Sequence, residues 1–217
     1  MNKIQDVNEA ISFIKDGMTV MIAGFMGVGT PHSIVDKMIE KGIKDLTIIC
    51  TDTARPDFGI GRLISNKMAK KVIASHIGTN AETGRQMNEG ELEVILTPQG
   101  TLAEQIRSGG AGLGGFLTPT GIGTIVEEGK KKLEIEGKEY ILELPLRADI
   151  ALIQGAKVDK KGNIYYDLAA RNFNPLMATA ADLVIVEADE IVEVGEINAN
   201  DVMTPGIFVD VIIEGSK

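Results

Sequence analysis

The stretch that decides the fold is TVMIAGFMGVGTP, residues 19–31, in which an apolar run gives way to glycines and then to a proline. The run is rich in β-branched residues, which indicates a buried strand. Thr30 is a suitable N-cap, and Pro31 suits the first position of a helix. We therefore expect a strand, a glycine-rich loop and the start of a helix.

The residues after this stretch complete a strand–helix–strand unit. Four apolar side chains share one face of the expected helix: Ile34, Val35, Met38 and Ile39. Gly42 follows them as a C-cap, and residues 45–52 form a second apolar strand. Such a unit, within about 35 residues, is typical of a right-handed parallel βαβ arrangement.

The alternation of strands and helices continues along the chain. Further helices are expected at residues 7–15, 59–67, 81–87, 100–110 and 168–181. Further strands are expected at residues 70–78, 91–98, 148–159 and 181–193. Residues 131–146 alternate like a hairpin with its turn at Glu136 and Gly137. The pattern predicts a single α/β domain over residues 1–217, with a mixed sheet and an added hairpin.

The composition excludes several classes of protein. The chain has 217 residues and a net charge of -9, which argues against a sequence-independent nucleic-acid binder. No apolar run approaches the ~20 residues of a membrane span, and the N-terminus shows no signal peptide. The single cysteine, Cys50, cannot form an internal disulfide. We expect a cytoplasmic protein without a metal site, since His32 and His76 stand far apart.

The loop itself invites comparison with a P-loop, G-x-x-x-x-G-K-[ST]. Gly24 and Gly29 have the spacing of the two glycines in that motif. A loop at a helix N-terminus presents backbone N–H groups and the positive end of the helix dipole to a phosphate. Thr30 and Pro31 nevertheless follow, with no lysine, and the motif needs that cation for the β and γ phosphates. The loop therefore does not indicate a nucleotide hydrolase.

Two other functions stay open from the residues alone. The order Gly24, Gly27, Gly29 departs from the G-x-G-x-x-G of dinucleotide-binding proteins. Asp52 ends the second expected strand, where an acid could bind a ribose, so an NAD-binding oxidoreductase-like domain is one alternative. The other alternative is a sugar-phosphate-sensing module of a regulator. Such a regulator would carry a DNA-binding appendage, and the chain has no basic segment that could serve as one.

A longer pattern covers residues 16–31, DGMTVMIAGFMGVGTP. It fits D-G-x-x-[apolar]3-G-G-F-x-x-x-G-x-P at every constrained position except Ala23, where the pattern has glycine. This resembles the alpha-subunit signature of the family I CoA-transferases. Residues 98–124 and 170–175 resemble two further blocks of that family, most of all in its bacterial acetate/butyrate–acetoacetate branch of 3-oxoacid CoA-transferases. The resemblance covers almost the whole chain.

The resemblance implies a fold and an activity. The family fold is a three-layer α/β/α arrangement with an open mixed, mostly parallel sheet and a β-hairpin, of the CoA-transferase/NagB-like type. These enzymes exchange coenzyme A between an acyl-CoA and a free short-chain carboxylate by a ping-pong mechanism. A glutamate attacks the thioester and comes to carry coenzyme A as a glutamyl thioester. Coenzyme A and acyl-CoA would be substrates, with no permanently bound cofactor.

The nucleophile of the family lies on its beta subunit, in a Ser-Glu-Asn-Gly type motif. No such motif occurs here: Glu89, Glu128 and Glu136 each precede glycine directly and not an Asn-Gly pair. The resemblance therefore implies a chain that is inactive alone and pairs with a separate beta subunit, as an α2β2 assembly. The expected substrates are acetate, butyrate and acetoacetate.

The resemblance also assigns the half of the site that this chain would supply. Gln99, just past an expected strand end, matches a family glutamine that stabilises an oxyanion, a task that needs a fixed donor. The expected coenzyme A-binding segment is Ala23, Gly24, Phe25, Met26, Gly27, Val28 and Gly29. Phe25 could wall the substrate pocket or plug the core, and Ala23 could face the sheet.

Two other features of the sequence allow more than one interpretation. The glycine-rich residues 109–123 could line the acyl pocket or lie at an interface between subunits. Asn172 and Asn174 could hydrogen-bond within a loop or reach the site.

Overall fold

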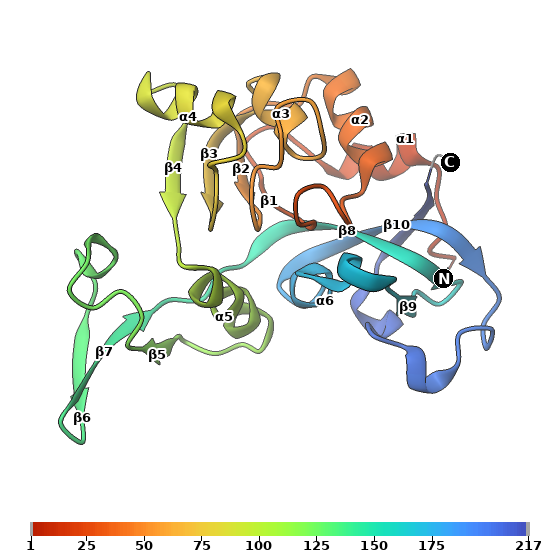
Figure 1. Cartoon of the computed structure of the whole chain (residues 1–217). Coiled ribbons are helices and arrows are strands. Elements are labelled where there is room, and N and C mark those ends of the chain that lie inside the picture. The colour runs from red at the N-terminus through yellow and green to blue at the C-terminus, as the bar shows by residue number, and fades with distance from the viewer. Residues whose placement is uncertain (1, 216–217) are drawn as a thin grey trace.

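The computed structural model describes residues 2–215, and its centre is an open sheet of seven parallel strands. The strands lie in the order β11-β10-β8-β1-β2-β3-β4 (Figure 1). Their bounds are Thr19–Ile22 (β1), Leu46–Ile49 (β2), Ala69–Ala74 (β3), Glu93–Leu96 (β4), Ala148–Asp159 (β8), Ala181–Val192 (β10) and Val211–Glu214 (β11). The short β9, Ile164–Tyr165, pairs antiparallel with β8 and makes the sheet mixed. The predicted mixed, mostly parallel sheet is confirmed.

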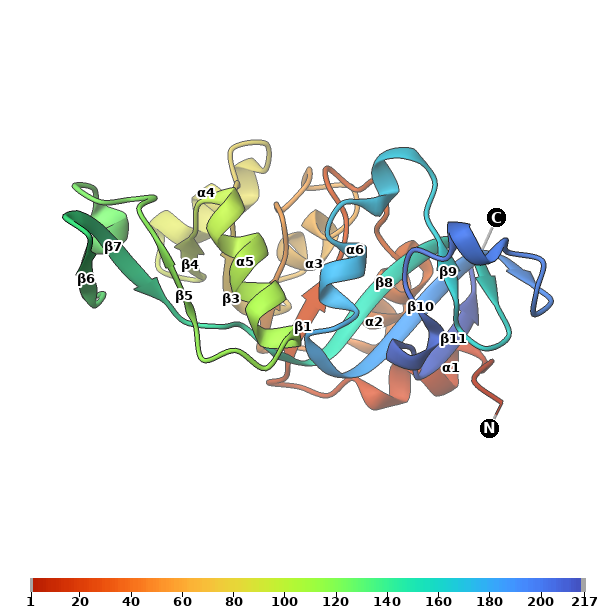
Figure 2. The ribbon, with the colours of Figure 1, turned by 90° about the horizontal axis from the view of Figure 1, so that it is seen from below.

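Helices cover both faces of the sheet, so the molecule has three layers (Figures 1 and 2). One face carries α1 (Val7–Ala10), α2 (His32–Lys41), α3 (Gly61–Ser65) and α4 (Ala81–Asn88). The other face carries α5 (Gln99–Gly110) and α6 (Asn174–Met177). The short 3-10 helices are Ile11–Phe13, Ile125–Glu127, Leu168–Arg171, Ala199–Asp201 and Gly206–Phe208.

The strand β1 shows how the sequence builds these layers. Val20 and Ile22 are buried in the apolar cluster that contains the side chains of α2 and α3. Met21 and Ala23 belong to the second cluster, on the other face, with Leu102 of α5. Because successive side chains of a strand point to opposite faces, a continuous apolar run fits a strand covered on both sides.

A second, smaller sheet stands away from the main one (Figure 1). It contains β5 (Phe116–Thr118), β6 (Lys132–Ile135) and β7 (Lys138–Glu143), antiparallel in the order β5-β7-β6. The predicted hairpin is confirmed as β6 and β7, and its turn residues Glu136 and Gly137 have φ of 52° and 77°. The third strand, β5, lies within the glycine-rich residues 109–123 and was not expected.

The predicted ends of several helices differ from those in the structure. The α2 helix starts at His32 with Pro31 as its N-cap residue, and Thr30 instead donates its hydroxyl to the carbonyl oxygen of Ala23 at 3.1 Å. The helix expected at residues 7–15 is a short α1 followed by a 3-10 turn. The helix expected at residues 168–181 is two separate turns, because Pro175 has no N–H to continue the first turn and suits the start of the second, and Asn172 and Asn174 use their side chains elsewhere.

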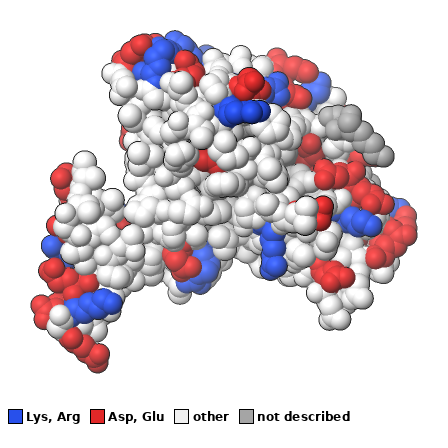
Figure 3. All heavy atoms as spheres, viewed as in Figure 1, with Lys and Arg blue, Asp and Glu red and all other residues white. Residues whose placement is uncertain are grey.

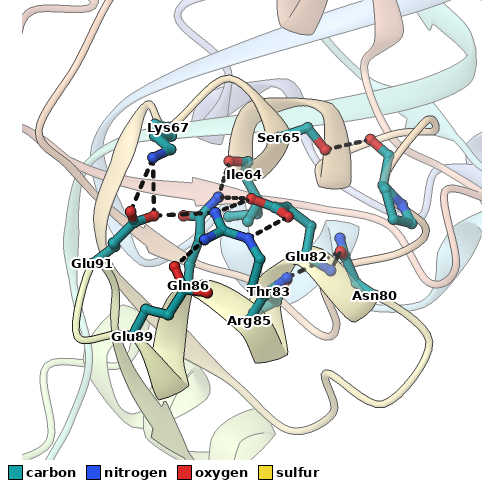
Figure 4. Close-up of polar contacts among 11 residues, drawn as sticks. Ile64, Ser65, Lys67, Asn80, Glu82, Thr83, Arg85, Gln86, Glu89 and Glu91 are labelled. Atoms are coloured by element: carbon teal, nitrogen blue, oxygen red, sulfur yellow. Dashed lines mark hydrogen bonds and ion pairs between the residues drawn. The ribbon is translucent and has the colours of Figure 1, made fainter.

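A network of charged side chains holds α4 against the start of β4 (Figure 4). The guanidinium of Arg85 contacts the carboxylates of Glu82, Glu89 and Glu91. Lys67, beyond α3, pairs with Glu91 at 3.0 Å, and the Gln86 amide donates to the Ile64 carbonyl oxygen at 2.8 Å. This network fixes the edge strand β4, whose far end leads to Gln99. Within residues 2–215 no helix is both long and apolar enough to span a bilayer.

Candidate active site

The carboxyl ends of the parallel strands form the candidate site. The chain runs outward from β1 through β2 and β3 to β4, and then returns beside β1 as β8. The strand order therefore reverses between β1 and β8. In open parallel sheets, ligands bind at the carboxyl ends of the strands near such a reversal. The residues that follow β1, β2, β3 and β4 include the segment 23–29, Asp52, Ser75 and Gln99.

The segment after β1 is a tight two-residue turn. The N–H groups of Phe25 and Val28 each donate to the other residue's carbonyl oxygen, at N–O distances of 3.0 and 2.9 Å. Between them, Met26 and Gly27 have φ of 52° and 87°, as a type I′ turn requires. The side chains of Phe25 and Val28 are each 50% exposed. Phe25 therefore does not plug the core, and it stands at the surface of the candidate site.

The glycines of this segment lie against protein groups. A Cβ on Gly24 would lie 2.0 Å from the hydroxyl oxygen of Thr30, and one on Gly27 would lie 2.2 Å from the ring of Phe58. Ala23 is buried in the core, and its N–H donates to the carbonyl oxygen of Leu152 at 3.0 Å. Ala23 thus faces the sheet and offers neither side chain nor N–H to a ligand. The exposed residues of the segment are Phe25 and Val28, which flank the half-buried Met26 and the buried Gly27.

Asp52 fixes this turn from the neighbouring strand end. The residue is 2% exposed. Its carboxylate accepts the N–H of Met26, at 3.0 Å from Oδ2, and the N–H of Ala54, at 2.7 Å from Oδ1. The alternative in which Asp52 binds a ribose is wrong, because the carboxylate is buried and bonded to backbone.

Two asparagines tie the turn to the rest of the sheet. The amide nitrogen of Asn174 donates to the carbonyl oxygen of Gly29 at 3.0 Å, while its oxygen accepts the N–H of Gln154 in β8 at 2.9 Å. The amide nitrogen of Asn172 donates to the carbonyl oxygen of Val28 at 3.0 Å. Both side chains therefore hydrogen-bond within loops, and in doing so they reach the turn.

Gln99 is the first residue of α5 and is exposed at the end of β4. Its amide oxygen contacts the hydroxyl of Ser75, which follows the neighbouring strand β3. No side chain of the described residues caps the start of α5, since Pro98 precedes Gln99. The amide of Gln99 thus stands at the carboxyl edge with its oxygen bound and its nitrogen available to donate.

The N-terminus of α2 is already capped and is not a phosphate site. The buried carboxylate of Glu187, from β10, accepts the N–H of Ser33 at 3.1 Å and the N–H of Ile34 at 3.1 Å. Burial raises the pKa of Glu187 above its ordinary value, against the effect of these hydrogen bonds. Sequence reasoning missed this residue because the strand and the helix are far apart in the chain.

A hollow of about 430 Å³ opens at Gly100, the residue after Gln99, and the carboxylate-bearing Glu104 is part of its lining. It lies between the first turn of α5, at Gly100 and Thr101, and the strand β5, at Phe116 and Leu117. Two glycines of residues 109–123 approach backbone, since a Cβ on Gly109 would lie 1.9 Å from the carbonyl oxygen of Leu146 and one on Gly115 would lie 2.6 Å from that of Glu143, whereas Gly112, Gly114 and Gly123 have open space around them. No group of three or more His, Cys, Asp or Glu residues that could hold a metal ion occurs within residues 2–215.

Charge is distributed unevenly over the face seen in Figure 3. Charged side chains gather over α4, over the far end of the small sheet and over the C-terminal part of the chain. Uncharged atoms predominate between them, where β2, β3 and β4 end. Figure 3 therefore shows the visible part of this edge to be largely uncharged.

Solved structures share this fold. With a TM-score of 0.85 and 21% identity, the structure matches an acyl-CoA transferase from Escherichia coli O157:H7 over 98% of this chain and 47% of that one. It matches the glutaconate coenzyme A-transferase of Acidaminococcus fermentans with a TM-score of 0.85 and 19% identity, over 98% of this chain and 75% of that one. At these identities the matches establish a shared α/β fold.

The sequence then gives the family. The model of the coenzyme A transferase family matches residues 4–215, so this chain belongs to that family. It is 58% identical to the alpha subunit of the acetate CoA-transferase of Escherichia coli K12, over 97% of this chain and 96% of the relative. It is 54% identical to the acetoacetyl-CoA:acetate/butyrate CoA transferase alpha subunit of Clostridium acetobutylicum, over 94% and 93% of the two chains.

Some relatives are much longer. A mitochondrial succinyl-CoA:3-ketoacid coenzyme A transferase of Mus musculus is 42% identical over 98% of this chain, which corresponds to 44% of the relative. More than half of that enzyme therefore has no counterpart here.

Proposed function

We propose that this chain is the alpha subunit of a short-chain acyl-CoA:carboxylate CoA-transferase that uses acetoacetate, butyrate and acetate. The proposal rests on one observation above all. An exposed amide, that of Gln99, stands at the carboxyl edge of the sheet, and the carboxylate nearest the neighbouring turn, Asp52, is buried and bonded to backbone. Gln99 thus offers a hydrogen-bond donor to a substrate at this edge, and the Asp52 carboxylate is not free to act as a nucleophile.

The three glutamates that precede glycine in the sequence do not lie at this edge of the sheet. Glu89 follows α4 and pairs with Arg85, while Glu128 follows a 3-10 turn near the small sheet. Glu136 stands at the tip of the β6–β7 turn. None of them follows the carboxyl end of β1, β2, β3 or β4. In keeping with the family resemblance, we expect the nucleophilic glutamate from a separate beta subunit, in an α2β2 assembly.

In the proposed reaction a glutamate carboxylate of the beta subunit makes the attack on the thioester carbonyl. The carbonyl π electrons move onto oxygen, and the amide N–H of Gln99 donates to this oxyanion. Collapse expels the coenzyme A thiolate and leaves a mixed anhydride. The thiolate then attacks the glutamyl carbonyl, which forms the glutamyl thioester and releases the carboxylate. The acceptor acid runs these steps in reverse.

The same geometry leads us to propose where the coenzyme A arm and the acyl group of the substrate bind. The turn from Phe25 to Val28 would contact the coenzyme A arm. The hollow between α5 and β5 would take the acyl group, because Phe116 and Leu117 give it apolar walls beside Gln99. Coenzyme A is a substrate in this scheme, with no resident cofactor. The buried free thiol of Cys50 is in keeping with a cytoplasmic enzyme.

Co-expression with a beta subunit tests this proposal. Exchange of coenzyme A from acetoacetyl-CoA to acetate is measured for the isolated chain and for the purified complex. We expect exchange by the complex and none by the isolated chain. Equal activity of the two preparations would contradict the split site.

A further inference from the structure

Ser75 connects the ends of three neighbouring strands. It follows β3, and its backbone N–H donates to the carbonyl oxygen of Thr51, after β2, at 3.0 Å. Its hydroxyl oxygen lies 2.7 Å from the same carbonyl oxygen and also contacts the amide oxygen of Gln99, after β4. Ser75 is half-buried, so its hydroxyl has a fixed environment.

The hydroxyl has one proton and two acceptors within reach. The carbonyl oxygen of Thr51 already accepts the backbone N–H of Ser75. The amide oxygen of Gln99 has no other donor among residues 2–215. The hydroxyl of Ser75 therefore donates its proton to the amide oxygen of Gln99, and this hydrogen bond holds that oxygen toward β3. The amide nitrogen then points away from the sheet and keeps both N–H groups for a ligand.

We infer that Ser75 is a positioning residue, which holds the Gln99 amide with its nitrogen toward the reacting carbonyl. The inference rests on the proposed function, in which Gln99 donates to the oxyanion. Without the hydroxyl, the amide can turn over and present its oxygen, an acceptor that repels an oxyanion. A single neutral hydrogen bond is enough to bias two such orientations by about tenfold.

The substitution Ser75→Ala isolates this role. The backbone N–H of Ser75 still donates to Thr51, so the strands β2 and β3 keep their connection. Ser75→Thr retains the hydroxyl and is the conservative variant. Ser65→Ala is the matched control, since that hydroxyl also donates to a backbone carbonyl oxygen, that of Pro56, at 2.8 Å and away from Gln99.

The experiment is a double-mutant cycle with Gln99→Ala in the complex with the beta subunit, with kcat and KM measured separately. We expect Ser75→Ala to lower kcat about tenfold with little change in KM. Ser75→Thr should recover most of the rate, and Ser65→Ala should match the wild type. In the Gln99→Ala background, Ser75→Ala should have no further effect.

Other outcomes separate the inference from the proposed function. If Gln99→Ala slows turnover but Ser75→Ala does not, Gln99 keeps its role and the inference about Ser75 is wrong. If Ser75→Ala lowers kcat equally with and without Gln99, Ser75 acts by another route and the inference is again wrong. If Gln99→Ala turns over at the normal rate, the oxyanion role of Gln99 fails, and the inference about Ser75 fails with it.

Discussion

The carboxylate of Asp52 holds the N–H of Met26, with 3.0 Å between Oδ2 and the amide nitrogen. Asp52 follows β2 and Met26 stands at the tip of the turn after β1, so one buried side chain joins the ends of two parallel strands. Met26 has a φ of 52°, a conformation that costs a non-glycine residue energy unless its surroundings fix it. The shape of the exposed turn therefore depends on a buried residue behind it.

Replacing Asp52 with Asn tests this dependence. The amide keeps one oxygen, which can stay 2.7 Å from the Ala54 nitrogen and 3.3 Å from the Met26 nitrogen, but an NH2 group replaces the oxygen 3.0 Å from Met26 and opposes its N–H, at a cost of about 1–3 kcal/mol. We expect faster hydrogen exchange of the Met26 amide and a KM for acyl-CoA raised about tenfold. Asp57→Asn is the control, because that side chain is 83% exposed in the next loop. An unchanged exchange rate at Met26 would show that Asp52 does not fix the turn.

Gly27→Ala tests the contact between the turn and Phe58. A Cβ at this position would lie 2.2 Å from the ring, and the φ of 87° strains any other residue. We expect a loss of about 1–3 kcal/mol in the free energy of unfolding, measured by urea denaturation. Gly84→Ala, inside α4 with open space around it, should instead stabilise the chain by about 0.5–1 kcal/mol. If both substitutions changed the free energy of unfolding equally, the close contact between the turn and Phe58 would be contradicted.

Gln99→Ala should lower kcat about 100-fold or more in the complex with the beta subunit, since it removes an oxyanion donor. Gln99→Glu should be at least as slow, because a carboxylate places negative charge where the oxyanion forms. Steady-state kinetics with acetoacetyl-CoA and acetate measure both. Turnover of Gln99→Ala close to the wild-type rate would remove Gln99 from the reaction.

Leu117→Phe tests the assignment of the hollow beside α5 to the acyl group. The larger side chain narrows the space between Leu117 and the first turn of α5. We expect kcat/KM for butyrate to fall about tenfold more than that for acetate, since each methylene contributes to binding in an apolar pocket. Leu113→Phe, on the same segment and 45% exposed, should leave the ratio unchanged. Equal losses for both acids would place the acyl group elsewhere.

Glu187 gives a prediction about pH. Burial raises its pKa in the folded chain above the ordinary value of 4.5, so the folded state holds this proton more tightly than the unfolded state. The stabilising effect of that proton is complete below pH 4.5 and is lost as pH rises through the raised pKa. Glu187→Gln should remove this pH dependence from the free energy of unfolding above pH 4.5. If the free energy of unfolding depended on pH in the same way for the wild type and for Glu187→Gln, the raised pKa of Glu187 would be contradicted.

The sequence was sufficient for features set by local signals. The apolar runs predicted the strands β1, β2, β3, β8 and β10, and the Glu136-Gly137 turn located the hairpin. Gln99 was also placed correctly, just past the end of a strand. These features depend on hydrophobic pattern and turn chemistry, which neighbouring residues carry.

Contacts between distant segments could not be predicted. Glu187 stands in the strand expected at residues 181–193, yet its carboxylate caps a helix far away in the sequence. The helix expected at residues 168–181 is interrupted before Pro175, a local signal that the expectation overlooked, whereas the bonds of Asn172 and Asn174 to Val28 and Gly29 could not be foreseen. Three residues of β5 are too few for a strand signal, and only pairing with β7 defines them.

The most direct test of the central claim is to locate the covalent intermediate. The complex with the beta subunit is incubated with acetoacetyl-CoA alone, the thioester is trapped, and each chain is mapped by peptide mass spectrometry. The account predicts a coenzyme A thioester on one glutamate of the beta subunit, with none on this chain. A thioester on any glutamate of this chain would contradict it.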